Sequence, residues 1–251
     1  PVSSSDALAT YLNQLGELRA DVARRDGYWE ELDGYVPSRA AVEGLGAIAD
    51  GYEELSLAFQ SVFADAPFPA NYLGRALEND ANEIARLEGR VSWMRDRGSA
   101  YNNWESALDD ERGVLDLATH HATEELPATQ RRLIRNLHWL QSALARVDAR
   151  LQILSGSHLE SRDASTLRQI GRIMDRVAED YSATVGDDET ARLLDASAEM
   201  SRLAGRLDLF VERGTIPGDS WGRTLNDEIA NVRWASRVAV EAALHSTHDP
   251  E

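Results

Sequence analysis

The chain has 251 residues, a formal net charge of -17 and 43% hydrophobic residues, which suits one large or two small globular domains with a sizeable core. All 26 basic residues are arginine, and the acidic excess argues against nucleic acid or an anionic membrane surface as a partner. The absence of cysteine excludes disulfide scaffolds, thiolate metal sites and cysteine nucleophiles.

Apolar residues recur with helical spacing along the chain, and the alternation typical of strands is missing. Proline, glycine and polar clusters divide the chain into six predicted helices, in the order short, short, long, short, short, long. We therefore expect an all-α fold. The predicted helices cover about 4–35, 38–64, 70–125, 127–154, 163–185 and 188–245, the last with a kink or short break at 214–219.

One short pattern occurs twice. "WESALDDE" at 104–111 and "WGRTLNDE" at 221–228 share Trp, Leu, Asp and Glu at the same spacing, 117 residues apart. Weaker matches flank this pattern, including "GAIAD" at 46–50 and "GRIMD" at 171–175. We interpret the pattern as the mark of an internal duplication.

Helix length then suggests an architecture for the duplicated chain. At about 1.5 Å per residue, each long helix spans roughly 80 Å, which two short helices placed end to end would match. The two halves would then pack as two stacked four-helix bundles in a single domain over 1–251, with both termini at the same end. The predicted bundles comprise 1–36, 100–155 and 219–248 for the end with the termini, and 37–99 and 156–218 for the far end.

Three charged residues fall on predicted core positions, where the spacing alternates between three and four residues. Glu111 and Glu228 are the repeated glutamates of the two patterns, and Arg25 lies on the stripe of the first helix. A buried charge needs a partner, so Arg25 could be held by Glu111 or Glu228 in an internal ion layer. A rotated stripe would expose these groups instead, and a third interpretation is a polar ligand held between the helices.

Further arginines lie on or beside the same predicted bundle, and the arginine fork matches the two oxygens of a carboxylate. The candidate ligand-binding residues are Arg19, Arg25, Arg135, Arg146, Arg233, Arg237, Glu111 and Glu228. No catalytic motif was found, and we predict no catalytic residue, no cofactor and no metal site. The His121/Glu124 and His245/His248 pairs are interpreted as solvated.

The duplicated short, short, long layout and the length resemble the helical bimodular sensor domain of bacterial chemoreceptors and some histidine kinases. The resemblance implies a periplasmic domain between two transmembrane helices. It also implies a homodimer without enzymatic activity, which binds a small organic acid such as a dicarboxylate and signals across the membrane. The chain opens without an initiator methionine, and we expect it to be part of a longer protein.

Two alternatives stay open. The paired arginines of the family's dicarboxylate binders are not clearly reproduced by Arg19, Arg24 and Arg25, and the core glutamates also suit an amino compound or a purine. A structural spacer of the spectrin or phage-tail type would explain the duplication and an ion layer equally well. A bundle enzyme ranks third, because no catalytic constellation is present.

Overall fold

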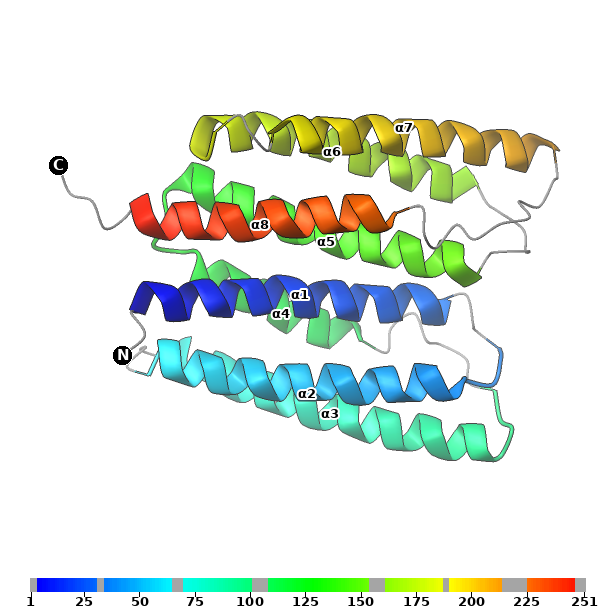
Figure 1. The fold of residues 1–251 in the computed structure, drawn as a ribbon. Coiled ribbons are helices and arrows are strands. Elements are labelled where there is room, and N and C mark those ends of the chain that lie inside the picture. Colours follow the sequence, from blue (N-terminus) through cyan, green and yellow to red (C-terminus); the bar gives the residue numbers. More distant parts are fainter. Residues whose placement is uncertain are drawn as a thin grey trace. The chain divides into compact units, whose positions relative to one another are not determined.

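The computed structural model describes residues 4–30, 34–64, 70–100, 108–153, 161–186, 190–213 and 225–246. These residues form eight α-helices and no strand, which confirms the all-α prediction (Figure 1). The helices are α1 (Ser4–Glu30), α2 (Arg39–Val62), α3 (Ala70–Asp96), α4 (Asp109–Ala122), α5 (Ala128–Ile153), α6 (Ser161–Thr184), α7 (Thr190–Arg213) and α8 (Asn226–Ser246).

The chain divides into two compact units, Pro1–Glu125 and Leu126–Glu251. In the first unit α1 packs on α2, α2 on α3, α3 on α4, and α4 returns to α1, so the four helices close a ring. In the second unit α5 packs on α6, α6 on α7, α7 on α8, and α8 returns to α5. Each half of the sequence therefore builds its own four-helix arrangement around its own apolar core.

The prediction of one uninterrupted helix over 70–125 is wrong, because α3 ends at Asp96. Gly98 has a φ of 65°, the left-handed conformation that favours glycine. The amide of Ser99 donates to the carbonyl of Met94 and the amide of Gly98 to that of Arg95, which is a Schellman termination. The chain turns here, and α4 packs against α3 instead of continuing it. Within the predicted helix 188–245, α7 ends at Arg213 and α8 begins at Asn226, and the predicted kink or short break at 214–219 lies outside the described residues. The described residues hold eight helices where six were expected.

The short helices of the first half lie side by side, not end to end as predicted (Figure 1). The described part of their connection contains Gly34 with a φ of 83°, and Ser38 caps α2 by accepting a hydrogen bond from the amide of Ala41. After the connection, α2 packs along α1. The compact units follow the two sequence halves, whereas each bundle predicted from the sequence combines pieces of both halves.

Burial repeats between the two units. Most buried positions of α1 recur 122 residues later on α5, and those of α4 recur 117 residues later on α8. Leu108 and Leu225, which directly precede α4 and α8, are buried as well. The two tryptophans of the repeated pattern, Trp104 and Trp221, lie outside the described residues. Other buried pairs at these offsets are Leu15/Leu137, Leu18/Leu140, Val22/Leu144, Asp26/Asp148, Leu115/Val232 and Ala118/Ala235. The matched burial supports the interpretation of an internal duplication.

Candidate functional site

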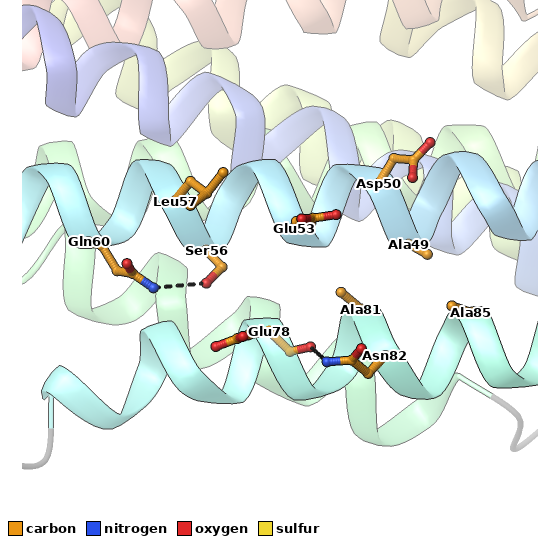
Figure 2. Close-up of a pocket in the computed structure, with 10 residues that line it drawn as sticks. All are labelled: Ala49, Asp50, Glu53, Ser56, Leu57, Gln60, Glu78, Ala81, Asn82 and Ala85. Atoms are coloured by element: carbon orange, nitrogen blue, oxygen red, sulfur yellow. Dashed lines mark hydrogen bonds between the residues drawn. The ribbon is translucent and has the colours of Figure 1, made fainter.

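A groove with a volume of about 480 Å³ runs between α2 and α3 on the surface of the first unit (Figure 2). Both helices contribute small side chains to the groove, and acidic and amide side chains stand around it. The residues that line the groove are Ala49, Asp50, Glu53, Ser56, Leu57, Gln60, Glu78, Ala81, Asn82 and Ala85. The groove is therefore polar and acidic, with an apolar part made mostly of alanine.

Close helix contacts hold the groove at both ends. At one end the buried hydroxyl of Ser56 on α2 donates to the carbonyl oxygen of Gly74 on α3 at 2.8 Å. At the other end Gly46 of α2 faces Glu88 of α3 so closely that an added Cβ would lie 3.1 Å from Oε1. Two tight contacts with small residues between them leave an open stretch in the middle of the helix pair. The groove thus results from two close contacts between the helices and from the small side chains that lie between these contacts.

Three carboxylates give the groove its charge: Asp50 and Glu53 on α2 and Glu78 on α3. Figure 2 shows Glu53 and Glu78 on the facing sides of the two helices. The side-chain amide of Asn82 donates to the backbone carbonyl oxygen of Glu78 at 2.8 Å, and that of Gln60 donates to Ser56 Oγ at 3.5 Å. These hydrogen bonds of the amide nitrogens fix the direction of the two amide oxygens. Among the described residues, no arginine lines the groove. A ligand that supplies positive charge and hydrogen-bond donors matches this chemistry.

The predicted arginines of α1 lie elsewhere. Arg19 forms an ion pair with Asp116 of α4 and donates to Thr119 Oγ1 at 3.4 Å. Arg25 packs over Gly44 of α2, where an added Cβ would lie 1.7 Å from Nη2, and its Nη1 donates to the carbonyl oxygen of Ala40 at 3.5 Å. The two arginines contact different neighbouring helices, so they do not form a shared clamp.

Burial shapes the chemistry of Arg25. Its guanidinium lies 5.8 Å from the ring centre of Tyr28, and burial lowers the pKa of the side chain. The predicted ion pair between Arg25 and Glu111 is absent among the described residues, where Arg25 contacts Tyr28 and α2. The alternative pairing of Arg25 with Glu228 stays a prediction. The core position of Arg25 is possible because Gly44 leaves room for the guanidinium.

The remaining predicted arginines belong to the second unit. Arg135 on α5 and Arg233 and Arg237 on α8 have exposed side chains, and Arg146 on α5 is half-buried. Their role in ligand binding stays a prediction.

Glu111 and Glu228 both lie in the first turn of a helix, on α4 and α8. Glu111 is half-buried, and its backbone carbonyl oxygen accepts a hydrogen bond from the buried hydroxyl of Tyr52 at 2.7 Å. Glu228 is only 8% exposed. Burial raises the pKa of both carboxyls, and neighbouring acidic groups raise it further. Periodicity placed both glutamates on core stripes, and their role in ligand binding stays a prediction.

The sequence interpretation missed the groove because it looked for arginines. A signal was present: Ala49, Glu53, Ser56 and Gln60 follow each other at helical spacing on α2. Such a stripe of small and acidic residues indicates a helix face that packs closely while it stays polar. His121, which was predicted to be solvated together with Glu124, is partly buried instead: its Nδ1 lies 3.5 Å from Glu124 Oε2, and its ring packs on Phe63 with ring centres 4.9 Å apart. His248 of the other predicted pair lies outside the described residues. Among the described residues, no group of three or more histidines and carboxylates is placed to hold a metal ion.

None of the described helices is both long enough and apolar enough to cross a membrane. Comparison of the chain with protein-family models, with curated proteins and with solved structures gave no match.

Proposed function

We propose that this chain is a ligand-binding sensor module and that the α2–α3 groove of the first unit binds a small alkyl amine or diamine. The observation that carries this proposal is the lining of the groove, where Asp50, Glu53 and Glu78 stand around small apolar side chains and the described lining residues include no arginine. This ligand class corresponds to the amino compound that the core glutamates had suggested as an alternative to an organic acid.

Each part of such a ligand has a counterpart in the groove. Ammonium groups donate charge-assisted hydrogen bonds to carboxylates, and methylene groups can lie against Ala49, Ala81 and Ala85. A purine fits less well, because none of the described residues that line the groove is aromatic. Exposed ion pairs contribute up to about 1 kcal/mol each and a buried methylene about 0.8 kcal/mol, which leads us to expect a dissociation constant of roughly 1 mM.

We further propose that the module works as a homodimeric periplasmic part of a transmembrane chemoreceptor, as the resemblance implies. Of the layout behind this resemblance, the described residues retain the all-helical character and a division into two halves, while the end-to-end short helices are absent among them. A diamine that bridges Glu53 and Glu78 would favour one spacing of α2 and α3, and a shift between two packings is how a bound ligand can be read at a distance. The organic-acid and spacer interpretations are the competing outcomes of the test.

Isothermal titration of the whole chain with 1,4-diaminobutane, amino acids, purines and succinate tests the proposal. We expect only the diamine and related amines to bind, with an affinity that falls as salt rises because the carboxylates are exposed. Glu53→Gln and Glu78→Gln should each weaken binding several-fold. Glu54→Gln is the matched control, since Glu54 is exposed on the same helix and does not line the groove.

Other outcomes decide between the alternatives. If succinate binds, and still binds to the Glu53→Gln and Glu78→Gln variants, the ligand is an organic acid held by arginines and the amine proposal is wrong. If no compound binds and the chain stays monomeric, a structural spacer becomes the better explanation. If Glu54→Gln weakens amine binding as much as Glu53→Gln does, the amine is attracted by the general negative charge of the chain and not by the groove.

A further inference from the structure

A second arrangement of acidic groups is built into both units, at the contact of α3 with α4 and of α7 with α8. Glu83 on α3 pairs with Arg86 one turn later, and Glu199 on α7 pairs with Arg202 in the same way, 116 residues further along. The electrostatic effect of Glu83 reaches Glu111, and that of Glu199 reaches Glu228. Each unit therefore sets a partly buried glutamate of its last helix near a glutamate of the preceding helix.

The first unit adds a further carboxylate, Asp80, one turn before Glu83. Its Oδ2 is shielded from solvent and has no hydrogen-bond partner among the described residues. The nearby hydroxyl of Tyr52 is already donated to the backbone of Glu111. The charged groups that act on Asp80 are Glu111 and Asp110 of α4 and Glu83 of its own helix, all of them acidic. An ionised Asp80 thus meets both burial and like charge.

Arg112 is the cation nearest in sequence to these acidic groups, and its guanidinium pairs with an acid of another helix. Arg112 of α4 and Asp116 both act electrostatically on Tyr52 of α2, which also senses Asp80 and Glu111. The guanidinium of Arg112, however, reaches Asp26 of α1 at 3.1 Å. The packing therefore leaves Asp80 with acidic neighbours on α3 and α4.

In the second unit the shielded carboxylate is Glu228 itself. Its Oε2 has no hydrogen-bond partner among the described residues, and the side chain is almost fully buried. The charged groups that act on it are Glu199 and Arg202 of α7 and Asp227 of its own helix. The position equivalent to Asp80, at the offset of 116, is Ala196. The two units thus place one shielded acid each at the same helix contact.

We propose that the protonation state of one carboxyl in each unit controls how firmly its last helix packs. When Asp80 in the first unit and Glu228 in the second are protonated, α4 and α8 stay packed. When these carboxyls lose the proton, the two helices loosen. A protonated carboxyl removes one of the repelling charges and becomes a donor for a neighbouring carboxylate. The device needs no ligand and is independent of the amine groove.

The direction of the pH effect follows from the environment of each group. Burial and acidic neighbours raise the pKa of Asp80 to about 7, and they also raise the pKa of Glu228. A raised pKa in the folded state means that the folded state holds more protons than the unfolded one. Stability is therefore greatest near the unfolded pKa and falls as pH rises toward the folded pKa. For a folded pKa of about 7, the equilibrium constant for opening of α4 should rise about tenfold from pH 6 to pH 8.

Peptide-resolved hydrogen exchange of the whole chain between about pH 6 and pH 8, corrected for intrinsic exchange rates, tests the proposal. We expect the opening constant of α4 to rise about tenfold over this range, and that of α8 to rise in the same direction. Asp80→Asn should remove the pH dependence of α4 and leave that of α8. Glu228→Gln should do the reverse, and it keeps the test valid if Asp80→Asn does not fold.

Glu54→Gln is the control for net charge, because it removes an exposed carboxylate from the first unit. It should retain the wild-type pH dependence of both helices. A pH dependence of α4 that survives in Asp80→Asn would overturn the proposal for the first unit. Equal pH dependence in all eight helices would overturn it for both units, because that result indicates general repulsion in a chain of net charge -17.

Discussion

Arg112 of α4 places its Nη1 3.1 Å from Oδ2 of Asp26 on α1, and Asp26 is 2% exposed. This ion pair spans the contact that closes the ring of the first unit, where α4 returns to α1. The equivalent acid of the second unit, Asp148, is also buried and accepts a hydrogen bond from Gln152 at 3.0 Å. The duplication has kept the buried acid and changed its donor.

Replacement of Arg112 by alanine should destabilise the first unit more than replacement of Asp26 by asparagine. Arg112→Ala removes a cation from a carboxylate that stays buried, with an expected cost of about 1–3 kcal/mol. Asp26→Asn removes the buried charge itself, so Arg112, which is 41% exposed, can turn to solvent or to Asp109. Urea unfolding of both variants measures the difference. A larger loss in Asp26→Asn would mean that the carboxylate is the main tie and that Arg112 is secondary.

Two buried tyrosines of the first unit should respond in opposite ways to loss of the hydroxyl. Tyr52 donates to the backbone of Glu111 and joins α2 to α4, so Tyr52→Phe should cost about 1 kcal/mol. The hydroxyl of Tyr11 has no hydrogen-bond partner among the described residues, while its ring packs on Phe59. Tyr11→Phe should therefore be neutral or slightly stabilising. Thermal unfolding of the two variants provides the comparison, and a clear loss in Tyr11→Phe would reveal an unrecognised polar partner.

Helical spacing places Tyr11, Leu15 and Val22 on one stripe of the first helix, and all three are buried. The architecture could not be predicted in the same way, because the length argument depended on an unbroken helix through 97–100. Only Gly98 marks the termination there, and an isolated glycine is compatible with both a helix and a helix end. One misjudged residue therefore changed the expected packing of α3 and α4.

The candidate site was predicted less well than the fold. Glu111 and Glu228 were recognised because periodicity places charges on a core stripe, but their neighbours on α3 and α7 depend on helix packing. Asp80 carries no sequence signal of its own, since a single acid on a helix surface is usually solvated. The groove depends on the approach of α2 to α3, which small residues permit but do not specify.

Two glycines of the second unit should differ when each is replaced by alanine. An added Cβ at Gly171 on α6 would lie 3.3 Å from the backbone oxygen of Ser197 on α7, whereas Gly205 on α7 has open space. Gly205→Ala should stabilise the unit by about 0.5–1 kcal/mol through helix propensity. Gly171→Ala should lose that gain because α6 and α7 must move apart, and the Ser197 hydroxyl bond to Gly171, now 2.9 Å, would lengthen. Equal unfolding midpoints for both variants would contradict this account.

Residues 1–125 and 126–251 should each fold when produced alone. Each half has its own apolar core, and its helices close a ring within the half. We expect each fragment to show a helical circular dichroism spectrum and one cooperative unfolding transition. The bundles predicted from the sequence, which join 1–36 with 100–155 and 219–248, lead to the opposite expectation, because neither half would then hold a complete bundle. Fragments that are unfolded alone and become helical only when mixed would favour that architecture over two separate units.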